Sequence, residues 1–125
     1  MPAYDEEGRI AKVIVAAKRY ADKIIVCEDG SSDDTGEIAG DLGAQVIVHE
    51  GNPGYGAALT TLFEEVKRKN ADVFVILDSD GQHQPHKIPE LVEPILEGRA
   101  DLVIGSSVIP EGFSPFCALL RHNSV

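Results

Sequence analysis

Apolar residues along the chain fall alternately at helical spacing and in short continuous runs. Helical spacing recurs in the segments 10–20, 33–42, 59–69 and 88–96, and strand-like runs occupy 24–27, 46–48, 72–77 and 102–104. Helices with one apolar stripe that alternate with short buried strands are typical of a parallel sheet covered by helices. The pattern therefore predicts an α/β fold, with a mostly parallel sheet and helices on both of its faces.

The two ends of the chain interrupt this pattern. Pro2 opens a loop of the kind that follows a strand, and the apolar stretch 116–120 begins a further element. We therefore expect the fold to be incomplete at both ends, with the strand 24–27 exposing an unpaired edge. Because exposed strand edges promote association, the chain is expected to be marginally stable or self-associating.

The charge of the chain narrows the partners that it can bind. Its 125 residues carry a formal net charge of −10, which repels the phosphates of nucleic acids. An anionic ligand would need a divalent cation to mediate its contact with such a protein.

No apolar run approaches the roughly 20 residues of a membrane-spanning helix, and the first residues lack a signal-peptide pattern, so we expect a cytoplasmic location. Cys27 and Cys117 form no Cys-x-x-Cys pair and are expected to be reduced thiols.

Three acidic clusters stand where sheets of this class bind ligands. The segments 4–7, 28–35 and 78–83 are rich in acidic side chains, and the second and third directly follow predicted strands. In open α/β sheets, ligands bind beyond the carboxyl ends of the strands. The joint placement of the clusters predicts a binding site at one edge of the sheet.

Asp78 and Asp80 are the strongest candidates for a metal site. Residues two apart at the end of a strand point the same way, so both carboxylates can reach one hard cation. Gln82 continues the alternation and can add a carbonyl oxygen. Such a cation, magnesium or manganese, would keep open positions for substrate phosphates. The alternative is a solvated acidic turn, for which Asp-x-Asp-Gly is also suitable.

The other polar segments have structural explanations beside the functional ones. Asp29 lies at a strand end, where a carboxylate can accept hydrogen bonds from a base or a ribose. One residue of 32–34 is instead expected to cap the following helix. The glycine-rich segment 52–56 is either a turn and helix start or a ligand contact. His83 and His86 lack a further zinc ligand and are expected to lie in a polar loop.

Four segments, taken in order, resemble the inverting family-two glycosyltransferases. They are Pro2-Ala3-Tyr4-Asp5-Glu6-Glu7, Glu28-Asp29-Gly30-Ser31-Ser32-Asp33-Asp34-Thr35, Asn52-Pro53-Gly54-Tyr55-Gly56-Ala57-Ala58 and Asp78-Ser79-Asp80-Gly81-Gln82-His83. The last segment is most similar to the branch that makes dolichyl- or polyprenyl-phosphate hexoses. The resemblance implies a GT-A fold (Rossmann-like), with residues 1–125 as a single partial domain, the nucleotide-sugar-binding half.

The resemblance also implies an activity and a site. The activity is metal-assisted transfer of a hexose from a UDP- or GDP-sugar to a polyprenyl phosphate, a dolichyl phosphate or a glycan acceptor, with peripheral association at the cytoplasmic face of the membrane. The implied nucleotide-sugar contacts are Pro2, Ala3, Tyr4, Glu6, Cys27, Asp29, Asp78, Ser79 and Asp80. The implied ligands of Mg²⁺ or Mn²⁺ are Asp78, Asp80 and Gln82. The family's catalytic base belongs to the acceptor-side half, so none is assigned here.

Two other functions fit the same residues. A truncated domain could bind a nucleotide sugar without turning it over. A haloacid-dehalogenase-type phosphatase also places Asp-x-Asp-Gly after a buried strand, with Asp78 as nucleophile, although its motif follows the first strand and has threonine or valine where Gln82 stands. The chain also departs from the glycosyltransferase pattern at Asp5, Glu28 and Ser107, where asparagine, aspartate and arginine are usual.

Overall fold

The computed structural model describes residues 1–105 and 116–121, with side chains described for residues 1–105. Its elements, in order, are β1 (Pro2–Ala3), α1 (Ile10–Ala17), β2 (Ile25–Glu28), α2 (Thr35–Asp41), β3 (Gln45–Val48), α3 (Tyr55–Arg68), β4 (Val73–Val75), a 3-10 turn (Pro85–Lys87), α4 (Ile88–Leu96), β5 (Leu102–Gly105) and β6 (Phe116–Arg121). The helices and strands expected from the apolar pattern are confirmed, with ends shifted by a few residues.

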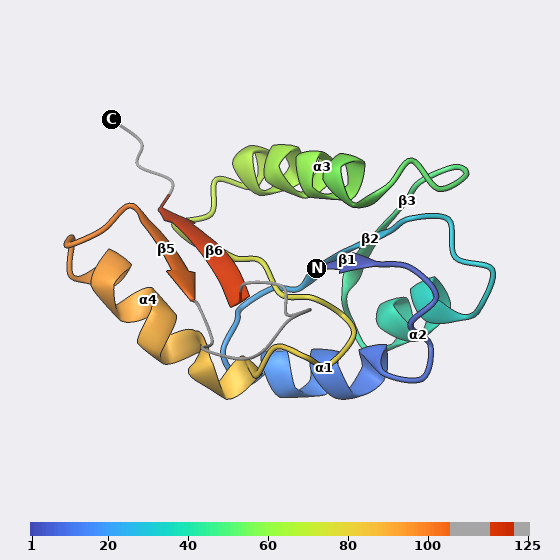
Figure 1. The fold of residues 1–125 in the computed structure, drawn as a ribbon, viewed down its shortest axis with the longest axis horizontal. Coiled ribbons are helices and arrows are strands. Elements are labelled where there is room, and N and C mark those ends of the chain that lie inside the picture. Colours follow the sequence, from blue (N-terminus) through green and yellow to red (C-terminus); the bar gives the residue numbers. More distant parts are fainter. Residues whose placement is uncertain (106–115, 122–125) are drawn as a thin grey trace, which may run out of the picture.

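The strands form two three-stranded sheets (Figure 1). In the first, the order is β1-β2-β3 and both pairs are parallel, with Cys27 opposite Pro2 on one side and Ile47 on the other. In the second, β6 lies between β4 and β5 and pairs antiparallel with both. The predicted parallel sheet is therefore confirmed for β1 to β3, and β6 adds antiparallel pairing beside it.

Helices cover both faces of the parallel sheet. α1 and α2 lie on one face and α3 lies on the other (Figure 1). Alternation along β2 divides its side chains between the two faces. Val26 belongs to the core cluster that contains Ile10 and Ile14 of α1, whereas Cys27 packs with Ala58 of α3. Both faces of β2 are therefore buried, which explains its continuous apolar sequence.

β2 is paired on both sides, contrary to the expected open edge. The backbone N–H of Cys27 donates to the Met1 carbonyl oxygen at 3.0 Å, and that of Asp29 donates to the Ala3 carbonyl oxygen at 2.9 Å. The α-amino group of Met1 donates to the Ile25 carbonyl oxygen at 2.9 Å. The expectation of an unpaired edge along β2 is therefore wrong, and the predicted self-association loses its stated cause.

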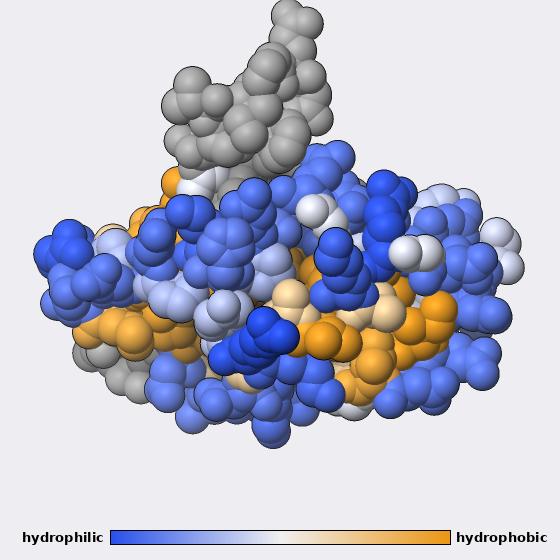
Figure 2. Space-filling model, turned by 90° about the horizontal axis from the view of Figure 1, so that it is seen from below, coloured by the Kyte–Doolittle hydropathy of each residue, from blue (hydrophilic) through white to orange (hydrophobic). Residues whose placement is uncertain are grey.

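Hydrophilic residues dominate the surface on the side of α1 and α4. Figure 2 shows this side, with apolar residues gathered in separate areas among them. The apolar stripe of α1 faces inward and consists of Ile10, Val13, Ile14 and Ala17; full burial of a branched aliphatic side chain contributes about 1.5–3 kcal/mol to stability. Among the described residues, none of the helices has the length and apolar character needed to cross a bilayer.

Candidate functional site

A cavity of about 450 Å³ opens at the carboxyl ends of β1 and β2, beside the first turn of α3. It is lined by Pro2, Ala3, Tyr4, Glu6, Asp29, Asn52, Gly54, Tyr55, Ala58, Asp78, Ser79 and Asp80. The glycine-rich segment, for which the sequence left both a turn and a ligand contact open, contributes Asn52, Gly54 and Tyr55 to this wall. The three acidic clusters therefore meet at one edge of the fold, together with a segment that sequence patterns did not assign.

Two of the expected site residues do not line the cavity. Cys27 is fully buried between β2 and α3, and burial raises the pKa of its thiol, which stays protonated at neutral pH. Gln82 is exposed, and its backbone N–H donates to Asp80 Oδ1 at 3.0 Å. This bond is that of an Asx turn, so turn chemistry accounts for part of the Asp-x-Asp-Gly segment. Ser107 and the side chain of Cys117 lie outside the described residues.

Asp78 is held at the cavity by contacts from Tyr55 and His83. Its Oδ1 accepts a hydrogen bond from the Tyr55 hydroxyl at 3.3 Å. Its backbone N–H donates to His83 Nδ1 at 2.9 Å, and Nε2 of the same ring lies 3.6 Å from Asp78 Oδ2. Since Nδ1 accepts, a neutral ring carries its proton on Nε2, beside the carboxylate. His83 lies in the loop between β4 and the 3-10 turn, as expected, but its side chain is buried there, with the residue only 4% exposed.

The two aspartates of this segment fit a cation that takes its other ligands from a substrate. Asp78 and Asp80 are partly buried, line the same cavity and present the oxygen ligands that hard cations prefer. Within the part of the chain that the structure describes, no group of three or more His, Cys, Asp or Glu is placed to hold a metal ion by itself. A cation at this place would therefore depend on phosphate oxygens to complete its coordination, as Mg²⁺ often does.

The first and second acidic clusters hold each other through backbone amides. Asp5 Oδ1 accepts the N–H of Ser32 at 2.8 Å, and the Ser31 hydroxyl accepts the N–H of Asp5 at 2.9 Å. The Thr35 hydroxyl accepts the N–H of Glu6 at 2.8 Å. Hydrogen bonds from backbone amides to carboxylates are stronger than those between neutral groups. The carboxylate of Asp5, beside the cavity, therefore helps to fix the two loops.

One of the residues 32–34 caps α2, as expected, and it is Asp33. Asp33 Oδ1 accepts the backbone N–H of Thr35 at 3.0 Å and is also hydrogen-bonded by the Thr35 hydroxyl. Asp34 occupies the N-cap position without a side-chain cap hydrogen bond. The hydrogen bonds from Thr35 lower the pKa of Asp33.

The lowered pKa of Asp33 predicts an acid-dependent contribution to stability. A carboxyl whose folded pKa lies below its ordinary value of 3.8 stabilises the fold above that value and loses this contribution as pH falls through the folded pKa. We expect the melting temperature of Asp33→Asn to fall less steeply than that of the wild type below about pH 4. Asp34→Asn, which removes the same charge from a side chain without a cap bond, is the control. Equal acid slopes for wild type and Asp33→Asn would contradict the prediction.

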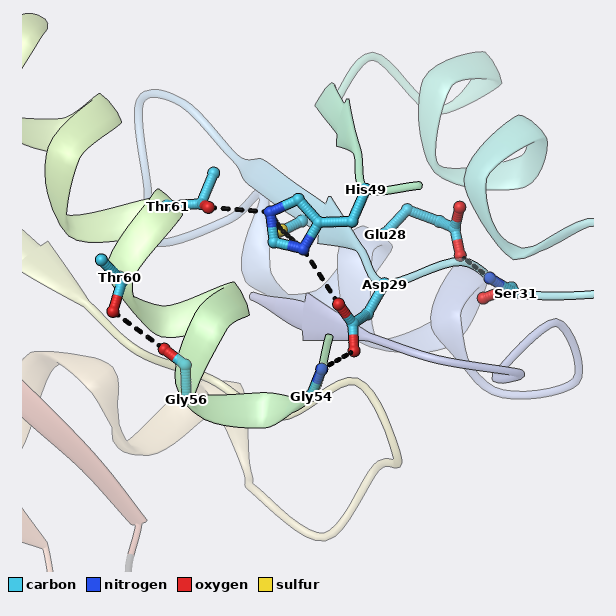
Figure 3. A network of polar contacts seen from close by, with 9 residues as sticks. Glu28, Asp29, Ser31, His49, Gly54, Gly56, Thr60 and Thr61 are labelled. Carbon is cyan, nitrogen blue, oxygen red and sulfur yellow. Dashed lines mark hydrogen bonds and ion pairs between the residues drawn. The ribbon is translucent and has the colours of Figure 1, made fainter. Parts of the chain in front are cut away.

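Asp29 is tied to the glycine-rich segment and to a histidine that sequence patterns did not single out (Figure 3). Its Oδ1 lies 2.9 Å from His49 Nδ1, and its Oδ2 accepts the backbone N–H of Gly54 at 3.0 Å. Asp29 is only 4% exposed, so a ligand can use only the lone pairs that these bonds leave. His49 directly follows β3, and the strand-end rule that selected Asp29 applies to it as well.

A parallel sheet covered by helices, with an acidic pocket at its carboxyl edge, is typical of open α/β domains, which bind their ligands at that edge. The chain matches the family model described as glycosyl transferase family 2 over residues 1–123. It therefore belongs to glycosyl transferase family 2, and its fold is of the GT-A type, as the four sequence segments indicated. This membership favours a glycosyltransferase over the phosphatase alternative.

Individual relatives agree with the family match. A UDP-N-acetylglucosamine–dolichyl-phosphate N-acetylglucosaminyltransferase of Methanococcus voltae is 32% identical over 126 residues, covering 86% of this chain and 50% of that protein. A polyprenol monophosphomannose synthase of Mycolicibacterium smegmatis is 31% identical over 120 residues, covering 90% and 45%. The chain therefore spans about half the length of the curated relatives it matches.

Solved structures show the same fold. Glucosyl-3-phosphoglycerate synthase from Mycobacterium tuberculosis, in complex with Mn²⁺, UDP and glucosyl-3-phosphoglycerate, matches with a TM-score of 0.69 and 31% identity. The match covers 89% of this chain and 43% of that one. That solved protein, which has a similar fold, thus contains both UDP and Mn²⁺.

Proposed function

We propose that this chain forms the donor-binding part of an inverting glycosyltransferase that moves a hexose from a nucleotide diphosphate sugar to a polyprenyl or dolichyl phosphate. The observation that carries the proposal is a cavity whose wall combines Asp78 and Asp80 with Asp29 and with four residues near the start of the chain, Pro2, Ala3, Tyr4 and Glu6. The family, and relatives named for dolichyl-phosphate and polyprenol products, support it. A lipid-phosphate acceptor requires contact with a membrane surface, and we place the enzyme at the cytoplasmic face.

Asp78 and Asp80 would hold magnesium or manganese against the diphosphate of the donor. When bound, such a cation neutralises the charge that develops on the leaving nucleotide diphosphate. The charge of the chain supports this requirement, because a protein of net charge −10 and an anionic donor repel each other without a counter-ion. The similar structure that holds Mn²⁺ with UDP supports a divalent cation as well.

The remaining residues of the wall would bind and orient the donor. Gly54 and Tyr55 stand at the N-terminus of α3, where the helix dipole favours an anionic group. Asp29 only accepts hydrogen bonds, so it suits the N–H groups of a base or the hydroxyls of a ribose. Tyr4, exposed at the cavity, offers an aromatic face against which a base can stack.

Calorimetry with UDP- and GDP-sugars tests the proposal. We expect one of these donors to bind in the presence of manganese or magnesium, and binding to be almost lost when a chelator removes the cation. Equal affinity with and without the chelator would contradict the metal-dependent part. If none of the nucleotide sugars binds under any condition, the proposal as a whole is wrong.

The alternative is a domain that binds the donor without turning it over. Binding measurements alone do not distinguish such a domain from an active glycosyltransferase. Its test is a transfer assay that combines the bound donor, the cation and a polyprenyl phosphate. Transfer of the hexose to the lipid would show an enzyme. Tight donor binding without transfer to lipid-phosphate or glycan acceptors would show a binding domain.

A further inference from the structure

His49 has polar contacts with several elements around the cavity (Figure 3). Its Nδ1 lies 2.9 Å from Asp29 Oδ1, and its Nε2 lies 2.8 Å from the Thr61 hydroxyl of α3. The Cys27 sulfur, on β2, lies 3.5 Å from Nε2. The side chains of His49 and Asp29 are only 17% and 6% exposed. The imidazole is therefore anchored at both nitrogens and packed against β2, which leaves it one orientation.

These contacts determine which ring nitrogen of His49 carries the proton. A carboxylate has no hydrogen to donate, so Nδ1 donates to Asp29. In the neutral ring, Nε2 then accepts from the Thr61 hydroxyl. Thr61 is β-branched and has few side-chain rotamers in a helix, so its hydroxyl is a well-defined partner. The Thr61 hydroxyl, which can donate or accept, thus accommodates the tautomer that Asp29 requires.

Asp29, held by His49, in turn forms a hydrogen bond to a residue of the cavity wall. Its second oxygen accepts the N–H of Gly54 at 3.0 Å, and Gly54 directly precedes α3 with a φ of 108°. Asp29 and Gly54 line the cavity, whereas His49 does not. Without the imidazole, the carboxylate would be free to rotate about its terminal torsion, which has a broad energy profile. Rotation would weaken the bond to Gly54 and displace the ligand-facing lone pairs.

We propose that His49 is a positioning residue for donor binding, which fixes the Asp29 carboxylate so that it can hold Gly54 and accept hydrogen bonds from the donor at once. The inference rests on the proposed function of the cavity and adds a residue that does not itself border the cavity. A carboxylate oriented before the donor arrives has less freedom to lose on binding. His49 therefore contributes to donor affinity through Asp29.

Two substitutions separate the contributions of the two ring nitrogens of His49. The side-chain nitrogen of asparagine takes about the place of Nδ1, and that of glutamine takes about the place of Nε2. His49→Asn therefore keeps a donor for Asp29 and loses the contact with Thr61. His49→Gln keeps a group beside Thr61 and loses the donor to Asp29. Both remove the ring from the same packed position against Cys27, so we expect similar losses in melting temperature.

Donor affinity distinguishes a positioning role from a purely structural one. We expect His49→Gln to bind the nucleotide sugar roughly tenfold more weakly than the wild type, since it loses a hydrogen bond to a charged group. His49→Asn should restore most of this loss. Equal weakening in the two variants, or a weakening that follows melting temperature alone, would overturn the inference.

Exchange of the Gly54 amide hydrogen, followed by nuclear magnetic resonance, gives a second readout that needs no ligand. We expect slow exchange in the wild type and in His49→Asn, and exchange roughly tenfold faster in His49→Gln, because local opening exposes the amide. If the wild type binds no nucleotide sugar, the proposed function fails, but the Gly54 amide still decides the role of His49. The same exchange rate in all three proteins would then overturn that role.

Discussion

Asp80→Asn is expected to weaken metal-dependent binding of the nucleotide sugar by at least about tenfold. Loss of an outer partner of a metal ligand already reduces metal affinity roughly 10–100-fold, and this change removes the charge of a proposed direct ligand. Asp80 shares the cavity with Asp78, so a single carboxylate of that pair would remain. The carbonyl oxygen of asparagine can still accept the N–H of Gln82, which preserves the turn. Affinity should therefore change more than stability, as calorimetry and thermal unfolding would show.

A second aspartate provides the matched control for charge. Asp41 is exposed at the end of α2 and does not line the cavity. Asp41→Asn changes the net charge by the same amount, so it should leave manganese-dependent affinity within about twofold of the wild type, as surface substitutions usually have small effects. The same loss in both variants would show that overall charge, not the Asp78 and Asp80 pair, governs donor binding.

Gly30→Ala is expected to destabilise the fold by about 2–5 kcal/mol, the sum of a left-handed backbone cost and an overpacking cost. Gly30 has a φ of 82°, and a Cβ atom there would lie 1.5 Å from the carbonyl oxygen of Gly51. That oxygen belongs to the backbone and cannot move aside as a side chain can. Gly30 follows Asp29 and Gly51 precedes Asn52, so the clash separates two walls of the cavity. Donor binding should be lost together with stability.

Gly98→Ala separates the two costs in the Gly30 prediction. Gly98 has a similar φ of 75°, but a Cβ atom there meets nothing within 4 Å. It should therefore show only the left-handed cost of about 1–2 kcal/mol. Thermal unfolding measures the difference: with roughly 4 °C lost per kcal/mol, Gly30→Ala should melt roughly 10 °C or more below the wild type and Gly98→Ala clearly less. Equal losses would mean that the loop at Gly51 yields to the added methyl group.

The helices, the strands and the edge that carries the site could be predicted from the sequence. Ile10, Val13 and Ile14 recur at helical spacing and are buried on α1, while the continuous run before Glu28 became a strand covered on both faces. These patterns repeat within a few residues, so the information is local. The cavity wall at Asp29 was accessible for a related reason, because parallel strands bring their carboxyl ends to one edge. The Asp78 and Asp80 pair was predicted by the same rule, although β4, the strand before it, pairs antiparallel with β6 in the structure.

Tertiary structure alone decided which polar groups meet at that edge. Asp29 bonds His49 and Gly54, which lie 20 and 25 positions along the chain, and Met1 closes an edge of β2 that the sequence predicted to be open. Burial of His83 against Asp78 was likewise decided by the fold. A hydrogen bond depends on the order of the strands and on the path of the chain between them, which no local period specifies. An aspartate at a strand end has the same sequence signature whether its carboxylate faces a ligand or a buried imidazole, and only the assembled fold distinguishes the two.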